Sequence, residues 1–269
     1  MALVLSEDQQ LLRDSARHFC QDNAPISVVR RLRDEKSELG YDEAIWRQMI
    51  ELGWPGMAIA EKYGGFEFGY TGLGLVLEET GRTLASSPLI SSVLLGASLL
   101  SEAGNEEQKS KLLPQIVAGD LRLAVGVDEG PHHAPSRVAC SAVKEGTEYI
   151  LTGTKSFILD GQTADKLLVS ARTSGEPYSE GGISLFMLDA NAQGLQIQRT
   201  TMVDSRNAAN LVMDQVRVSE DSLLGVEGAG FTALDTTLDI ARIGVASEML
   251  GSVQEIFQRI VEYLKQREQ

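Results

Sequence analysis

The sequence is short of basic residues, and this shortage excludes several classes of partner. Its 269 residues include 24 Lys and Arg against 38 Asp and Glu, which gives a formal net charge of −14. Proteins that bind nucleic acid normally carry a basic surface. Contact with anionic lipid headgroups also needs clustered basic residues. We therefore expect no nucleic acid and no charged membrane surface as a partner.

Cysteines and long apolar runs are equally scarce. The only two cysteines, Cys20 and Cys140, lie far apart and form neither a metal-ligand pair nor a disulfide framework, which is typical of a reducing cytosol. The N-terminal residues MALVLSEDQQ have no basic segment followed by an apolar run, so we predict no signal peptide. The most apolar stretch, residues 88–100, is interrupted by serines and a glycine and is shorter than the about 20 residues of a membrane span. We expect a cytoplasmic protein.

Several common catalytic motifs are missing. The sequence has no Gly-Lys dipeptide of a phosphate-binding loop, no G-x-S-x-G and no H-E-x-x-H, which removes support for familiar nucleotidase and hydrolase chemistry. There are only three histidines, and two of them, His132 and His133, are adjacent. Adjacent side chains on a strand point in opposite directions, so joint chelation is awkward and we predict no metal site.

Residues 1–118 have the pattern of a helical domain. Ser6 with Gln9, and Asn105 with Gln108, form capping pairs at the start of two helices. The adjacent glycines Gly64 and Gly65 favour a turn. Helical periodicity or helix-favouring composition extends over residues 42–52, 71–84, 88–102 and from 105 to just before Gly119.

Residues 119–225 have the pattern of a β-domain. About seven short strands are expected, at residues 121–127, 137–144, 149–152, 166–171, 183–188, 195–198 and 210–218. Such closely spaced strands with no long helix between them indicate an antiparallel barrel or sandwich. Arg172, which follows the fourth run, is expected on the strand surface.

Residues 226–269 form one long amphipathic segment. Its apolar residues recur every three or four positions from Leu234 to Leu264, which predicts a single continuous helix. An apolar stripe of this length must pack against other helices, and the sequence supplies none after it. We favour a fragment that ends inside a helical bundle. The alternative is a helix that pairs with another subunit. The predicted fold class is α+β.

Several motifs in order resemble one family. Residues 61–66 (EKYGGF) look like E-x-x-G-G, residues 153–161 (GTKSFILDG) look like G-x-K-x-[aromatic]-I-T-N-G, and residues 214–231 look like the exit from a β-domain. Residues 239–242 match D-x-x-R, and residues 265–269 look like the start of R-x-Q-F-G. The sequence is identified as a member of the acyl-CoA dehydrogenase family. It most resembles a divergent bacterial branch that includes the pimeloyl-CoA dehydrogenase small subunit, apparently truncated in its C-terminal domain.

The resemblance implies a fold and a chemistry. It implies an N-terminal helical domain (1–118), a central antiparallel β-barrel-like domain (119–225) and the first helix of a C-terminal four-helix bundle (226–269). Family members use FAD to convert an acyl-CoA to a trans-2-enoyl-CoA and pass the electrons to electron-transfer flavoprotein. A homo- or hetero-oligomer is expected.

Two segments correspond to the family's flavin contacts. In the first, Val125, Val127 and Asp128 are implied as cofactor-binding residues, with Asp128 in place of a Thr or Ser hydroxyl; the alternative is an ordinary loop.

The second segment contains Phe157, Ile158 and Leu159. Phe157 occupies the place of the aromatic side chain that lies against the isoalloxazine; the alternative is a core residue. Leu159 replaces a Thr or Ser that donates a hydrogen bond to flavin N5, and only a backbone N–H remains for that bond.

The resemblance also implies substrate contacts. Asp239 and Arg242, one turn apart on a helix, correspond to residues that contact the CoA–acyl group; the alternative is a solvated ion pair. Arg267 corresponds to an arginine that binds the FAD pyrophosphate of a neighbouring subunit; the alternative is an arginine at a frayed helix end. Ala241 stands where some members place the catalytic Glu, and the family's other location lies beyond residue 269, so we assign no catalytic base.

These departures leave other functions open. The chain is an acyl-CoA dehydrogenase, or a non-catalytic or half-site subunit of a heteromeric acyl-CoA dehydrogenase. A third hypothesis is an acyl-CoA oxidase or flavin hydroxylase on the same fold. The length and branching of the acyl chain are not specified by the sequence.

Overall fold

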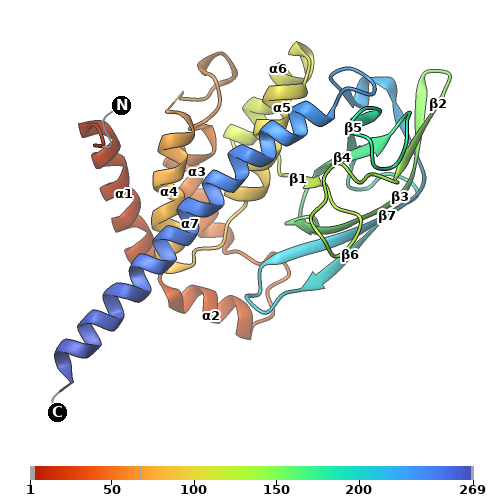
Figure 1. Cartoon of the computed structure of the whole chain (residues 1–269). Coiled ribbons are helices and arrows are strands. Elements are labelled where there is room, and N and C mark those ends of the chain that lie inside the picture. The colour runs from red at the N-terminus through yellow and green to blue at the C-terminus, as the bar shows by residue number, and fades with distance from the viewer. Residues whose placement is uncertain (1–3, 67, 268–269) are drawn as a thin grey trace.

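A computed structural model of the chain describes residues 4–66 and 68–267 and shows a helical part, a sheet and one long final helix (Figure 1). The short 3-10 helices η1 (Trp54–Gly56) and η2 (Glu61–Tyr63) and the π-helix η3 (Leu89–Ala97) connect the other helices. The α-helices of the first part are α1 (Glu7–Asn23), α2 (Ile26–Asp34), α3 (Glu43–Glu51), α4 (Gly69–Thr83), α5 (Ser98–Ala103) and α6 (Glu106–Val117).

The helix ends follow the local chemistry of the sequence. The Ser6 hydroxyl accepts the Gln9 N–H and the Gln9 side chain accepts the Ser6 N–H, so the predicted capping box is confirmed. Asn105 and Gln108 form the same reciprocal pair at the start of α6. Gly53 ends α3 with a φ of 75°, in the left-handed region that glycine adopts without strain.

Two helical details differ from the expectation. Helix α2 is not among the predicted helices, although Ile26, Val29 and Leu32 recur at the spacing of an amphipathic helix. The segment 88–102 is not one α-helix but η3 followed by α5. The Ser92 hydroxyl both donates to the Leu123 carbonyl (3.1 Å) and accepts the Leu123 N–H (3.0 Å), and a Cβ at Gly96 would lie 2.5 Å from Leu123 Cβ. The π-helix is therefore fitted against the first strand.

The second part is one eight-stranded sheet. Its order is β6-β7-β3-β2-β4-β5-β8, with β1 paired to β4. Most pairs are antiparallel, as predicted, but β1 runs parallel to β4, with Leu123 opposite Lys166, and β2 also meets β4 in the parallel sense. The strands are β1 (Leu123–Gly126), β2 (Ser141–Glu145), β3 (Glu148–Leu159), β4 (Lys166–Arg172), β5 (Ile183–Asp189), β6 (Leu195–Thr201), β7 (Asn207–Ser219) and β8 (Leu223–Leu224).

The pairing of β3 with β7 is interrupted near its end. The register shifts between Lys155 and Ile158, so Ser156 and Phe157 form a bulge in β3. A bulge turns side chains away from the regular alternation of a strand. This irregularity determines how the candidate site is presented.

The final helix, α7 (Phe231–Gln266), has 36 residues and at about 1.5 Å per residue is roughly 54 Å long. It begins beside the sheet, crosses α4 and continues away from the sheet to its C-terminal end (Figure 1). The predicted single long helix is confirmed. Beyond the crossing its apolar side chains are exposed, among them Met249, Val253, Ile256, Phe257, Ile260 and Leu264. No helix among residues 4–66 and 68–267 is long and apolar enough to cross a membrane.

Helices α4 and α7 cross with their backbones in contact. A Cβ at Gly81 would lie 2.0 Å from the Glu248 carbonyl oxygen, and a Cβ at Gly251 would lie 1.7 Å from the Glu78 carbonyl oxygen. Only glycine fits at either position, so the pair of glycines sets the distance between the two helices.

Replacement of Gly251 tests this contact. We expect Gly251→Ala to lower the free energy of unfolding by about 1–3 kcal/mol, because the added methyl group forces the two backbones apart. Urea unfolding measures the change. Gly74→Ala is the matched control, since the new Cβ on α4 would meet only the Ser247 side chain, with the hydroxyl at 3.2 Å. Equal stability of the two variants would contradict the packing argument.

Candidate functional site

A buried lysine ties together the strands around the site. The Lys155 side chain is fully buried, and its Nζ donates to Glu129 Oε1 (2.8 Å), Ser170 Oγ (2.9 Å) and the Val127 carbonyl (3.2 Å). A buried ammonium is tolerated only when it is paired and hydrogen-bonded. Glu129 in turn accepts backbone N–H groups of the next segment, from Ala139 (2.7 Å) and from Cys140. The cluster therefore holds β1, β3 and β4 in register around the loop that follows β1.

Phe157 is presented to solvent by the bulge in β3. Its φ is +56°, its N–H donates to Asn210 Oδ1 (2.9 Å), and the preceding Ser156 N–H donates to the Asp128 carbonyl (2.7 Å). The side chain is 55% exposed, so it is not a core residue. An aromatic residue held in a left-handed conformation is uncommon, and such strain is concentrated at binding sites.

The other residues of the two predicted flavin-contacting segments are mostly covered. Val125 and Ile158 are buried, and Val127 and Leu159 are partly buried and pack against the core. The side chains of Val125 and Ile158 therefore face the interior. A ligand at this edge would meet their backbone groups and the Phe157 ring.

Asp128 does not extend into open space. One carboxylate oxygen lies 2.9 Å from His133 Nδ1, and the other accepts the Ala134 N–H at 2.8 Å. Both partners belong to the same loop between β1 and β2. The carboxylate that replaces the expected hydroxyl is therefore satisfied within its own loop.

The predicted substrate pair lies on α7. Arg242 forms an ion pair with Asp239 one turn earlier, and both side chains are at least half exposed. Arg242 also lies 3.3 Å from His133 Nε2, measured from its Nη2. Through this contact the structure brings the predicted residues Asp128 and Arg242 together, with His133 between them.

Arg267 is separate from the rest. It caps the C-terminal end of α7 and is exposed. At the helical rise per residue it lies roughly 35–40 Å along the axis from Arg242. Glu268 and Gln269, which end the predicted motif, lie outside the described residues.

Asp160 is a partly buried carboxyl that the sequence did not single out. It accepts a hydrogen bond from Ser91 Oγ, which joins the turn after β3 to η3. Burial raises the pKa of Asp160 from 3.8 to about 6, although this hydrogen bond and the positive charges of Arg206 and Arg122 oppose the shift. The only sequence signal was an acidic residue at the Asn position of the family motif.

The expected surface position of Arg172 is wrong. The side chain is buried rather than on the surface. Its guanidinium donates to a ring of five backbone carbonyls, those of Ser136, Val138, Ser174, Ser179 and Gly181. A guanidinium has five N–H donors, so the ring of carbonyls offsets the cost of burial, which lowers the pKa of Arg172.

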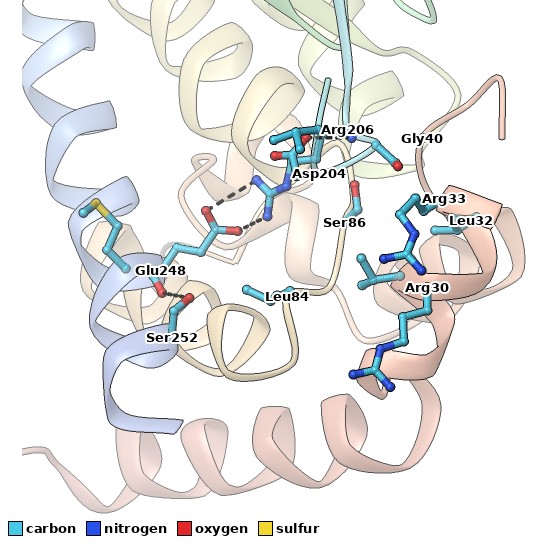
Figure 2. A pocket seen from close by; sticks show the side chains of 14 residues that line it. Arg30, Leu32, Arg33, Gly40, Leu84, Ser86, Asp204, Arg206, Glu248 and Ser252 are labelled. Atoms are coloured by element: carbon cyan, nitrogen blue, oxygen red, sulfur yellow. Dashed lines mark hydrogen bonds and ion pairs between the residues drawn. The ribbon is translucent and has the colours of Figure 1, made fainter. Parts of the chain in front are cut away.

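Two cavities differ in their relation to the site. The first, of about 350 Å³, has Arg206 and Glu248 paired on one wall and Arg30 and Arg33 of α2 on the opposite wall (Figure 2). Neither Phe157 nor Arg242 lines it. The second, of about 310 Å³, lies against the loop after β1 and is lined by residues that include His132, Arg137 and Tyr178.

The comparisons with known proteins agree on one family. The profile described as "Acyl-CoA dehydrogenase, N-terminal domain" matches residues 6–120, and the profile described as "Acyl-CoA dehydrogenase, middle domain" matches residues 129–216. An acyl-CoA dehydrogenase of Bacillus subtilis is 30% identical over 98% of this chain and 70% of its own length.

Solved structures give the same result. A chain in the structure of the electron transferring flavoprotein of Acidaminococcus fermentans is 31% identical, with a TM-score of 0.86 over 100% of this chain and 71% of that one. The G363A variant of the steroid ACAD named Tcur3481-Tcur3483 is 34% identical, with a TM-score of 0.83 over 98% of this chain and 68% of that one.

The buried lysine provides a stability test. We expect Lys155→Met to lower the free energy of unfolding by about 3–5 kcal/mol, because Glu129 is left as an unpaired, largely buried charge. In the double variant Lys155→Met/Glu129→Gln no such charge remains, so part of that loss should be recovered. Urea unfolding of both variants measures the difference; a double variant less stable than the single one would contradict the pairing.

Asp160 provides a pH test. Its folded-state pKa lies above its unfolded value, so the stability that the protonated carboxyl contributes is present below pH 3.8 and is lost as the pH rises through about 6. The loss corresponds to about 3 kcal/mol at most. Asp160→Asn should therefore stabilise the protein at pH 8 and have much less effect at pH 4, as measured by urea unfolding. Asp120→Asn, an exposed control, should show no such pH dependence, and a constant effect of Asp160→Asn would contradict the burial argument.

Proposed function

The chain belongs to the acyl-CoA dehydrogenase family, and we propose that it provides the β-domain face and first C-terminal helix of a site that oxidises an acyl-CoA to a trans-2-enoyl-CoA. The observation that carries this proposal is Phe157. Its exposed ring stands on a bulge whose backbone is held on one side by Asp128 and on the other by Asn210. A flat apolar surface that is held rigidly suits a planar ring system.

As a flavoprotein oxidoreductase of this family, the chain takes FAD as its cofactor. The residues present fit this group: the Phe157 ring is open to solvent, and the nearby Asp128 carboxylate is already bonded to His133 and Ala134. Phe157 would lie against the isoalloxazine, and backbone groups of Val125, Val127, Ile158 and Leu159 would contact its edge. When bound, FAD accepts the two electrons of the oxidation.

We propose binding roles for two arginines of α7. The Arg242 guanidinium, paired with Asp239, would bind the CoA–acyl group. Arg267, at the other end of α7, would reach a cofactor bound by a neighbouring subunit. A general base has to remove the α-proton, and we assign that role to no residue of this chain. The division into domains 1–118, 119–225 and 226–269, the cytoplasmic location and the homo- or hetero-oligomeric state belong to the same proposal.

Electron-transfer flavoprotein is the proposed electron acceptor. The supporting observation is the likeness to a chain in the structure of the electron transferring flavoprotein of Acidaminococcus fermentans. We also propose the divergent bacterial branch as the position within the family.

A half-site subunit is the second candidate. It is favoured by three positions at which the chain lacks a functional group of the family: Asp128 and Leu159 replace hydroxyl donors, and Ala241 stands where some members have the catalytic Glu. One similar structure is described as the Tcur3481-Tcur3483 steroid ACAD, a description that joins two protein names. This likeness is consistent with an assembly of two different subunits. In this reading the chain completes the site of a homologous partner.

Flavin retention tests the proposal. FAD should bind to the protein purified alone or together with a homologous partner, and Phe157→Leu should weaken that binding about tenfold, because the loss of ring stacking is worth ~1.4 kcal/mol. Fluorescence titration with FAD measures the affinity. Tyr178→Leu, which removes another exposed aromatic ring of the β-domain, should leave it unchanged.

The reaction separates the candidate functions. Bleaching of bound flavin by an acyl-CoA without oxygen supports the dehydrogenase. Flavin that is retained only after co-expression with a homologous partner supports the half-site subunit, and rapid peroxide formation in air supports an oxidase. Absence of flavin under all these conditions would refute the proposed site.

A further inference from the structure

His133 joins the β-domain to α7. Its Nδ1 lies 2.9 Å from Asp128 Oδ2 in the loop after β1, and its Nε2 lies 3.3 Å from Arg242 Nη2 on α7. The three side chains therefore form a continuous chain of polar contacts. None of them was linked to another by the spacing of the sequence.

The chemistry of the partners determines the tautomer of this histidine. A guanidinium has only donors, so Nε2 of His133 is the nitrogen that accepts from Arg242. A carboxylate has only acceptors, so Nδ1 is the nitrogen that donates to Asp128. The contacts therefore specify the Nδ1–H tautomer, the arrangement by which an acidic residue orients a histidine at many functional sites.

The orientation of Asp128 is itself restrained. Its second oxygen accepts the Ala134 N–H at 2.8 Å, and its carbonyl accepts the Ser156 N–H at 2.7 Å. The carboxylate therefore cannot rotate freely, and the imidazole that it binds is aimed at α7. On the other side, Asp239 holds the same guanidinium through Nη1.

We propose that His133 is a positioning residue: bound to Asp128 as the Nδ1–H tautomer, it holds the Arg242 guanidinium at the gap between the loop after β1 and α7. The contribution to acyl-CoA binding rests on the proposed function, which gives Arg242 a substrate contact. His133 and Asp239 restrain the guanidinium from two sides, and its remaining N–H groups are left to donate to oxygen atoms of the acyl-CoA.

The contacts from Asp128 through His133 to Arg242, called the relay below, also account for the acidic residue at position 128. A free carboxylate beside a reduced, electron-rich flavin would be unfavourable. Here the Asp128 carboxylate binds His133, and His133 in turn contacts the Arg242 guanidinium on α7. The loss of a hydroxyl and the presence of a histidine in the same loop are thus two parts of one arrangement.

The tautomer can be measured directly. The chain has only three histidines, so long-range ¹H–¹⁵N spectra of the ¹⁵N-labelled protein at pH 8 resolve each imidazole, and the His133→Gln and His132→Gln variants assign the two in the loop. We expect the Nδ1–H tautomer for His133 and its loss in Asp128→Ala. An Nε2–H tautomer, or a spectrum of His133 unaffected by Asp128→Ala, would overturn the proposal. This measurement needs neither flavin nor substrate.

Ligand binding tests the consequence. With butyryl-CoA as the probe in calorimetry, His133→Leu should weaken binding about tenfold, whereas His133→Gln should stay within about threefold, because an amide can donate to Asp128 and accept from Arg242. The matched control is His132→Leu, which should bind like the wild type. Equal binding by the His133→Leu variant and the wild type would overturn the positioning role. If the wild type itself does not bind butyryl-CoA while the tautomer is found as expected, the proposed function fails and the relay stands.

Discussion

A fully buried lysine ammonium is the constraint on which the arrangement of the β-domain depends. Lys155 lies next to the bulge of β3, and Glu129 follows the strand β1, so their pairing holds the two candidate flavin-contacting segments together. Because each charge would be costly without the other, the loop after β1 cannot move away from β3. The Phe157 bulge and the Asp128 loop thus owe their relative position to this buried pair as well as to the hydrogen bond from the Ser156 N–H to the Asp128 carbonyl.

Polar side-chain contacts also join the helical part to the sheet. The Ser92 hydroxyl on η3 donates to the Leu123 carbonyl on β1, and the Ser91 hydroxyl donates to the partly buried Asp160. His133 connects the loop after β1 to Arg242 on α7. Farther along α7, the glycine contacts with α4 fix the path of the long helix. Polar bridges and close backbone contacts, together with a shared apolar core, therefore place α7 beside the β-domain. A ligand between them would meet two surfaces whose separation is already set.

The structure shows where the side chains that depart from the family motifs lie. Asp128 lacks the hydroxyl that the family uses, yet its carboxylate is bonded within its own loop to His133 and to the Ala134 N–H. Leu159 is partly buried against the core, so it adds apolar surface and offers no side-chain donor. The replacements at positions 128 and 159 therefore change the chemical groups that the chain itself can supply at the site.

Local chemistry in the sequence determined much of the secondary structure: the capping boxes at Ser6 and Asn105, the stop at Gly53, the run of strands and the length of α7 all arise from interactions between near neighbours. The motif order indicated the family and named Phe157, Asp239 and Arg242. The parallel pairing of β1 with β4, the bulge that exposes Phe157, the buried Lys155–Glu129 pair and the link from Asp128 through His133 to Arg242 were decided only by the tertiary structure. The physical reason is that each depends on groups from distant parts of the chain, whose burial and orientation are set by packing and leave no periodic trace in the sequence.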